Sequence, residues 1–362
     1  MTTQLTPKEW TAEELGDRIF DSCNAAFDVY TMHLGRKLGF YEELKTSALT
    51  SGELSERTGT TERYVREWLE QQAVTGLLSV EDAASGAFER RYSLPQGYAE
   101  VLTDRDSLSY FGPATSMTAA AGAQLPSLAE AFRTGGGVSW EQFGEDMRIG
   151  QGEINRPLFL RVLAPEWLAS HPEVDTLLSA DGARVADIGS GLGWSAIGIA
   201  QHYHNAHVTG LDVDEPSVEA ARLNAAELGV ADRVSFQLVD PGRETEEDAY
   251  DVVIACECLH DMPDPVAVLT GARRLARPGG AVLILDERTH DSFTVDAGDM
   301  ERFLYGFSVT TCLPDGMSHN PSVGTGTVMR RSTLEAYAHS AGFERVEDLT
   351  IDHDQFRLFR LI

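Results

Sequence analysis

The chain has 362 residues, of which 57 are acidic and 29 are basic, so its formal net charge is −28 at neutral pH. This length is sufficient for two domains, and 42% of the residues are hydrophobic, enough to form a core in each. So acidic a chain is a poor partner for nucleic acid, because Lys and Arg must neutralise the phosphates. Its hydrophobic runs are too short for a membrane span, which takes about 20 residues. No basic segment leads into a hydrophobic one at the N-terminus, so we expect a cytoplasmic protein without a secretory signal.

The first domain that we expect, residues 1–110, is a mainly helical winged-helix domain. Hydrophobic side chains at helical spacing predict two helices within residues 11–45. Two shorter helices follow, the second beginning after Thr61, and together they have a helix-turn-helix pattern. Residues 76–80 and 88–94 flank a polar, glycine-containing stretch and predict the two strands of a wing.

The charge of this module bears on what it binds. Residues 51–91 contain eight acidic and five basic side chains, a net charge of −3. A module that reads DNA is expected to be basic. We therefore favour a role in dimerisation or in covering a substrate over DNA binding. The next segment, residues 111–165, is rich in Gly, Ala and Ser, and we expect it to be a helical connector that lines a pocket.

The second expected domain, residues 166–362, contains five predicted strands that each end on a polar or acidic edge. The first strand leads into a glycine loop followed by a helix. Glycines take positive φ readily and let backbone amides approach a ligand at the start of a helix. In open parallel sheets, ligands bind in the crevice beyond the carboxyl ends of the strands. The residues placed there are Asp187, Gly189, Gly191 and Gly193 of the loop, then Asp212, Asp240, residues 257–261 and Asp286.

A glycine loop alone leaves the class of ligand open. NAD(P)-dependent oxidoreductases have one too, but theirs is Gly-x-Gly-x-x-Gly and it holds a phosphate. Here the loop is Gly-x-Gly-x-Gly, and the surrounding acids suit a cationic ligand that has no phosphate. A winged-helix transcriptional regulator with a ligand-sensing Rossmann domain is the second alternative.

From about residue 165 to its end, the chain resembles the class I S-adenosylmethionine-dependent methyltransferases. The resemblance rests on the glycine loop, the acid-ended strands, the Arg277-Pro-Gly-Gly280 turn and the terminal segments 343–351 and 356–362. It implies an α/β fold, namely a Rossmann-like, doubly wound, seven-stranded sheet with an antiparallel C-terminal hairpin. It also implies S-adenosyl-L-methionine as cofactor. Its methionine end would lie at Asp187, Gly189, Gly191 and Gly193, its ribose at Asp212 and its adenine amine at Asp240.

Joined to the winged helix, this domain further resembles the dimeric small-molecule O-methyltransferases of the plant caffeic-acid type and their bacterial relatives. In that family a His-Asp pair after the fourth strand supplies the general base, and here His260 and Asp261 occupy that place. The resemblance implies a homodimer that methylates a small molecule, foremost at a hydroxyl oxygen, without a metal ion. His260 would be the general base and Asp286 would orient its ring. The family's Trp after the pair is replaced by Met262, and a pocket-lining role for His260 is the alternative.

A hydrophobic stripe lies between the fifth strand and the terminal segments. Met300, Phe303 and Phe307 recur at helical spacing on one helical face. Such a stripe either packs in the core or faces an apolar or aromatic acceptor. The sequence does not distinguish a phenol from an enol, a carboxylate or a nitrogen as the methylated group.

Overall fold

The computed structural model describes residues 9–243 and 246–362, which fall into two compact units. The first unit comprises the residues up to Ala120 together with 145–157, and the second comprises 121–144 and 158–362. These units are defined by how the chain packs and not by function. The expected functional boundaries at residues 110 and 165 therefore stay predictions.

The first unit contains the expected winged helix. Its elements, with one that continues into the second unit, are α1 (Ala12–Lys37), α2 (Phe40–Leu44), α3 (Ser51–Thr58), α4 (Glu62–Val74), β1 (Ser79–Val80), β2 (Tyr92–Ser93), α5 (Gln96–Thr103) and α6 (Pro113–Ala123). The wing strands pair antiparallel, with Val80 opposite Tyr92. Thr61 takes the N-cap position of α4, as predicted, although its side chain makes no capping hydrogen bond. The core of the unit gathers around Trp68, whose ring packs edge-on against Phe40 and Tyr41.

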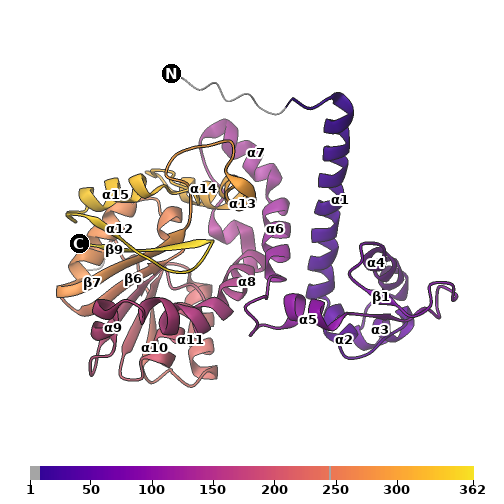
Figure 1. The fold of residues 1–362 in the computed structure, drawn as a ribbon, viewed down its shortest axis with the longest axis horizontal. Coiled ribbons are helices and arrows are strands. Elements are labelled where there is room, and N and C mark those ends of the chain that lie inside the picture. The colour runs from indigo at the N-terminus through magenta and orange to yellow at the C-terminus, as the bar shows by residue number, and fades with distance from the viewer. Residues whose placement is uncertain (1–8, 244–245) are drawn as a thin grey trace. The chain divides into compact units, whose positions relative to one another are not determined.

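The second unit is built on a seven-stranded sheet in the order β5-β4-β3-β6-β7-β9-β8 (Figure 1). Its strands are β3 (Arg184–Ile188), β4 (His207–Asp212), β5 (Val234–Leu238), β6 (Tyr250–Cys256), β7 (Ala276–Glu287), β8 (Val346–Leu349) and β9 (Phe356–Leu361). The strands from β5 to β7 in this order are parallel, and β9 runs antiparallel to both of its neighbours. This topology confirms the predicted fold class, including the antiparallel pair at the C-terminus.

Helices cover both faces of this sheet (Figure 1). The covering helices are the π-helix η1 (Phe159–Leu168), α9 (Pro172–Leu178), α10 (Trp194–His202), α11 (Glu215–Glu227), α12 (Pro265–Leu275) and α15 (Arg331–Ser340). The remaining helices are α7 (Leu125–Thr134), α8 (Trp140–Leu158), most of which belongs to the first unit, η2 (Leu259–Asp261), α13 (Gly298–Phe307), η3 (Ser308–Cys312) and α14 (Leu313–Met317). η1, α9, α10 and α11 form one core with Val185 of β3. α12 and α15 form the other with Ala186, because successive strand side chains point to opposite faces. The two cores lie on the faces of the sheet, and loops follow the carboxyl ends of its parallel strands.

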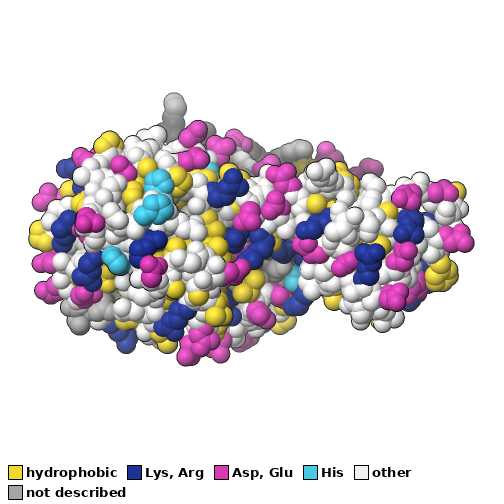
Figure 2. All heavy atoms as spheres, turned by 90° about the horizontal axis from the view of Figure 1, so that it is seen from below, with side chains coloured by type: hydrophobic (Ala, Val, Ile, Leu, Met, Phe, Trp, Pro, Cys, Tyr) yellow, Lys and Arg dark blue, Asp and Glu magenta, His cyan; other side chains and the backbone are white. Residues whose placement is uncertain are grey.

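The helices and the surface bear on the expected absence of a membrane or nucleic-acid partner. Within the described residues, no helix has the length and hydrophobicity to cross a membrane. Figure 2 shows one face of the protein, on which Lys and Arg side chains are intermixed with acidic ones. This face therefore has no continuous basic surface of the kind that binds nucleic acid.

Candidate active site

The glycine loop follows β3 and leads into α10. Gly189, Gly191 and Gly193 all have positive φ, at 67°, 50° and 84°. A Cβ at Gly193 would lie 2.5 Å from the Phe236 ring. At Gly189 it would lie 2.7 Å from the Cys258 sulfur, whereas at Gly191 it would meet nothing within 4 Å. Packing therefore requires two of these glycines, and the backbone of Gly191 is open to a ligand.

Asp187 lies at the end of β3, beneath this loop, and is only 1% exposed. Its Oδ2 accepts a hydrogen bond from the Ser195 hydroxyl at 2.5 Å. Its Oδ1 is buried and has no partner among the described residues. Burial raises the pKa of Asp187 to about 7; the Ser195 bond opposes this, and the Asp212 carboxylate adds to it. A buried carboxylate oxygen without a donor fits the ammonium group of a ligand.

Asp212, at the end of β4, contacts the glycine loop directly. Its Oδ2 accepts from the Gly191 N–H at 2.7 Å and its Oδ1 from the Asp214 N–H at 2.9 Å. Asp240 follows β5, where its Oδ1 accepts from the Gly242 N–H at 2.9 Å, a contact typical of a turn. The structure thus brings Asp212 to the loop and leaves Asp240 at the end of the neighbouring strand.

His260 lies on η2, after β6, and is 3% exposed. Its Nδ1 lies 2.9 Å from Oδ1 of Asp286 and 3.1 Å from Oε2 of Glu287. Its Nε2 lies 3.3 Å from Oδ1 of Asp261. The predicted residues His260 and Asp286 are therefore in contact. Glu287 was not predicted, because neighbouring strand residues normally point to opposite faces, yet both carboxylates reach the ring at the end of β7.

Three carboxylates determine the charge of the imidazole. Burial acts to lower the pKa of His260, but Asp261, Asp286 and Glu287 together raise it well above its usual value. Burial raises the pKa of Glu287 well above its usual value, and Asp286 adds to this. For Asp286, the imidazolium outweighs burial and lowers the pKa. The acidic neighbours therefore favour the protonated form of the imidazole.

A later segment, residues 313–327, packs against η2 beside Asp261. The Gly326 N–H donates to the His260 carbonyl at 3.1 Å, and a Cβ at Gly316 would lie 3.0 Å from the Asp261 carbonyl. Asp315 of α14 accepts a hydrogen bond from the Trp140 N–H at 2.7 Å. Burial raises the pKa of Asp315 to about 7, and the Asp261 carboxylate adds to this. Sequence reasoning gave no role to this segment.

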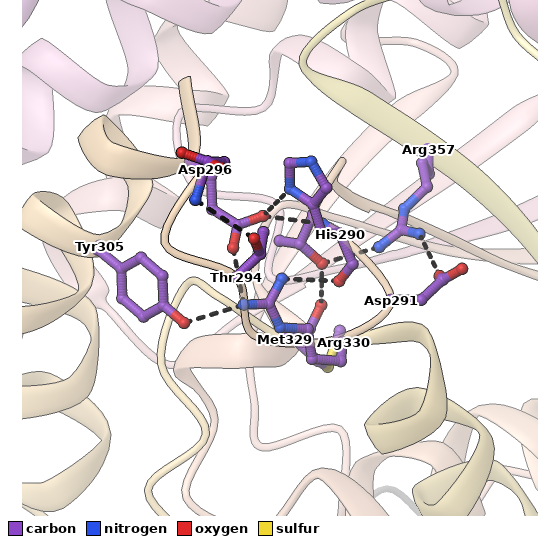
Figure 3. A network of polar contacts seen from close by, with 10 residues as sticks. His290, Asp291, Thr294, Asp296, Tyr305, Met329, Arg330 and Arg357 are labelled. Atoms are coloured by element: carbon purple, nitrogen blue, oxygen red, sulfur yellow. Dashed lines mark hydrogen bonds and ion pairs between the residues drawn. The ribbon is translucent and has the colours of Figure 1, made fainter. Parts of the chain in front are cut away.

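A buried ion pair joins α13, which precedes this segment, to Arg330, which follows it (Figure 3). Glu301 of α13 is 2% exposed and accepts from the His290 N–H and Nδ1 at 2.8 and 2.7 Å and from Arg330 at 2.7 Å. Arg330 also donates to the His290 carbonyl at 2.6 Å and to the Tyr305 hydroxyl at 2.9 Å. Burial acts to raise the pKa of Glu301, but the bonds from Arg330 and His290 lower it to about 2. The Glu301 carboxylate thus connects α13 to Arg330, four residues after Gly326, which contacts His260.

The hydrophobic stripe of α13 does not pack in the core. Met300 is 42% and Phe303 is 43% exposed, and Phe303 stacks on Phe307 with 6.0 Å between ring centroids. Of the two interpretations of this stripe, the structure excludes core packing.

Two groups of side chains around His260 have the composition of a metal site. One combines His260 with Asp261 and Cys312, and the other combines it with Asp286 and Glu287. In each group the candidate ligand atoms lie within 4.8 Å of one another. A metal on either nitrogen would occupy a lone pair of the imidazole, so it would compete with a role as base. That the protein uses no metal stays a prediction.

Comparison with known proteins identifies two parts of the chain. Residues 179–311 match the family described as "Methyltransferase domain", and residues 27–104 match the "Rv2258c-like winged HTH domain". The ubiquinone biosynthesis O-methyltransferase of Aeromonas salmonicida is 39% identical over 103 residues, which are 28% of this chain and 42% of that protein. That of Pseudomonas aeruginosa is 36% identical over 113 residues, 31% of this chain and 47% of that protein. The chain thus spans less than half the length of these curated relatives.

Solved structures resemble the chain over nearly its whole length. Mitomycin 7-O-methyltransferase MmcR has a TM-score of 0.68 at 20% identity and covers 96% of this chain and 97% of its own. Human N-acetylserotonin methyltransferase, in complex with SAM, has a TM-score of 0.66 at 17% identity and 99% coverage of both chains. These likenesses confirm the fold, with the winged helix first and the Rossmann-like domain after it.

Proposed function

We propose that the chain transfers a methyl group from S-adenosyl-L-methionine to a small molecule, since residues 179–311 match a methyltransferase domain family and residues 27–104 match a winged HTH family. One observation carries the proposal: the unpartnered, buried Oδ1 of Asp187 lies beneath the glycine loop in which Gly191 is open to a ligand. Such a pair of features suits the ammonium and carboxylate of an amino acid. The ligand's methionine end fits there, with Asp212 at its ribose and Asp240 at its adenine amine.

The electrostatics of the site suit this cofactor better than a dinucleotide. When bound, S-adenosyl-L-methionine supplies a methyl group on a positively charged sulfur. Asp187 and Asp212 offer negative charge at the loop, where a pyrophosphate would be repelled. The neighbouring strand ends add the carboxylates of Asp261, Asp286 and Glu287. We therefore favour methyl transfer over the oxidoreductase alternative.

We infer that a hydroxyl oxygen is methylated and that His260 accepts its proton. Methyl transfer is a displacement at carbon, so the protein aligns the two reactants and removes a proton. Asp286, 2.9 Å from Nδ1, orients the ring, and Nε2, which lies 3.3 Å from Oδ1 of Asp261, is the nitrogen that would take the proton. The imidazolium must first lose its own proton. A cation that binds nearby lowers the pKa of His260, so the arrival of cationic ligands would prepare the base.

We further propose that the protein is a homodimer. One face of α1 exposes Leu15, Ile19, Phe27 and Leu34, each at least 47% accessible, and Leu38, 43% accessible, follows directly after the helix. Monomeric proteins rarely expose so long a hydrophobic face. A second copy of this chain would cover it.

Calorimetry with S-adenosylhomocysteine and with NAD(P) tests the proposed cofactor. We expect the former to bind and the latter to have no effect. Asp212→Ala should weaken binding at least tenfold, because the carboxylate contacts the loop. Asp232→Ala is the matched control, since Asp232 is exposed and lies outside the site. Binding of NAD(P) without any binding of S-adenosylhomocysteine would show the proposal to be wrong.

A further inference from the structure

Buried polar atoms that form no hydrogen bond gather around His260. Four such atoms are Oδ1 of Asp261, Oδ2 of Asp286, Oε2 of Glu287 and the Thr327 hydroxyl. Of these, the Asp261 and Glu287 oxygens do lie at ion-pair distance from the imidazole, at 3.3 and 3.1 Å. Thr327 is only 2% exposed. Buried polar groups are normally hydrogen-bonded, so each exception calls for an explanation. Several exceptions in one place point to a ligand that supplies the missing partners.

Asp261 and Thr327 lie on the same side of the imidazole. The Asp261 carboxylate is the neighbour of Nε2, the nitrogen that would take the proton. Thr327 follows Gly326, whose N–H donates to the His260 carbonyl. Its side chain also lies beside the Cys312 thiol, and the sulfur is within 4.8 Å of the ligand atoms of His260 and Asp261. The Thr327 hydroxyl and the Asp261 carboxylate, which both lie beside the Cys312 thiol, thus border one location.

This location is rich in carboxyl groups. Asp315 adds a second carboxylate to that of Asp261, and α14, which carries it, packs on the Asp261 carbonyl through Gly316. Among the described residues, no Lys or Arg pairs with either carboxylate. The imidazole of His260 lies there too, but Asp286 and Glu287 already interact with it at Nδ1. Two carboxylates at low dielectric favour a cation.

We propose that the methyl acceptor carries a cationic amine, held by Asp261, Asp315 and Thr327, beside the hydroxyl that is methylated. The inference rests on the proposed function and names its substrate class. An alkylammonium has three N–H donors and no acceptor, which matches two carboxylates and a hydroxyl oxygen. Charge-assisted hydrogen bonds of this kind are about twice as strong as neutral ones.

The proposal also explains why oxygen, and not nitrogen, receives the methyl group. A protonated amine has no lone pair, so the nucleophile is the neighbouring hydroxyl. The carbon–sulfur bond breaks with its electron pair on sulfur, the carbon–oxygen bond forms, and the hydroxyl proton goes to Nε2 of His260. An ammonium beside Asp261 also weakens the support that this carboxylate gives to the imidazolium, which frees the base when the acceptor is present.

Three catechols of similar size test the substrate class: dopamine is cationic, 4-propylcatechol neutral and 3,4-dihydroxyphenylacetate anionic. Their binding to protein saturated with S-adenosylhomocysteine is measured by calorimetry, and methyl transfer from labelled S-adenosyl-L-methionine is measured alongside. We expect dopamine to bind at least about tenfold more tightly than 4-propylcatechol, and the anion to bind least. Asp261→Asn and Asp315→Asn should each reduce this ratio severalfold. Asp299→Asn, an exposed carboxylate on α13, should retain it.

Each other outcome overturns the proposal. A ratio near one, a preference for the neutral or anionic catechol, or an unchanged ratio in both variants would exclude a cationic subsite, whether or not methyl is transferred. Stoichiometric metal in the purified protein, lost in Cys312→Ser, would show that a metal ion takes the place of the ammonium. Failure of the proposed function is distinguishable, because the protein would then not bind S-adenosylhomocysteine at all.

Discussion

Nδ1 of His260 lies 2.9 Å from Oδ1 of Asp286, which joins residues 26 positions apart through the adjacent strands β6 and β7. η2 follows β6, and Asp286 is the last residue but one of β7. The pairing of these two strands therefore sets the distance between His260 and Asp286. A carboxylate on one ring nitrogen fixes the orientation of the other. The pair therefore has the geometry of an oriented base.

Replacing His260 by Ala should reduce methyl transfer by at least about 100-fold, the usual contribution of a general base. The affinity for S-adenosylhomocysteine should change little, because the glycine loop and Asp212 hold the cofactor. Turnover with the best acceptor from a screen and calorimetry with the product cofactor measure the two effects. Unchanged turnover would leave His260 with a pocket-lining role only.

Asp286→Asn should move the acidic limb of the pH–rate profile to lower pH. The Asp286 carboxylate helps to raise the pKa of His260. Without it the imidazolium loses its proton at lower pH, and a base acts only when deprotonated. The maximal rate should fall as well, since the ring is less firmly oriented. A limb that stays in place or moves to higher pH would contradict this role for Asp286.

Binding of S-adenosyl-L-methionine should strengthen as the pH rises through 7. The pKa of Asp187 is about 7 in the described structure, and a cationic ligand prefers the ionised carboxylate, so binding releases a proton. Calorimetry in buffers of different ionisation enthalpy measures this release near pH 6.5. In Asp187→Asn the release should vanish and the affinity should fall. Proton uptake in the wild-type protein would refute the assignment.

The sequence predicted the parts of the site that local patterns encode. Hydrophobic runs that end on acids place Asp187, Asp212 and Asp286 at one edge of a parallel sheet, because such strands share their carboxyl ends. Asp315 and Thr327 carry no comparable signal. The segments that carry them reach His260 and Asp261 only through Gly316 of α14 and Gly326, in contacts between residues more than 50 positions apart in the chain.

The structure differs from the expectations based on the sequence in two further respects, each with a physical reason. Glu287 lies beside Asp286 at the imidazole because β7 ends there and the alternation of its side chains ends with it. The sequence shows that Glu287 follows Asp286, but not that both side chains point to the same place. The stripe of Met300 and Phe303 is periodic but exposed, and periodicity alone does not show what covers a helical face. An apolar acceptor was therefore one interpretation of the stripe, while the buried polar atoms near Asp261 that form no hydrogen bond favour a charged one.

Glu301→Gln should destabilise the protein by roughly 3–5 kcal/mol, because it leaves the half-buried Arg330 without its carboxylate. The pKa of Glu301 is lowered to about 2, so its contribution is complete above about pH 4.5, its unfolded pKa, and is lost as the pH falls toward 2. Urea unfolding at pH 7 measures the difference. Glu335→Gln, which breaks the exposed pair with Arg331, is the control and should cost at most about 0.5 kcal/mol. Equal effects of both variants would mean that the buried pair adds no special stability.

The exposed face of α1 should mediate dimerisation. Ile19 is 56% and Phe27 is 62% exposed, and both lie on this face. Burying such side chains gives about 25 cal/mol for each Å² of apolar surface removed from water, whereas burying a carboxylate is costly. Sedimentation velocity should therefore show a dimer for the wild-type protein and a monomer for Ile19→Glu/Phe27→Glu. Val74→Glu changes an 89%-exposed residue on α4 and should leave the dimer intact. A monomeric wild-type protein at micromolar concentration, or a double variant that still dimerises, would exclude this face as the interface.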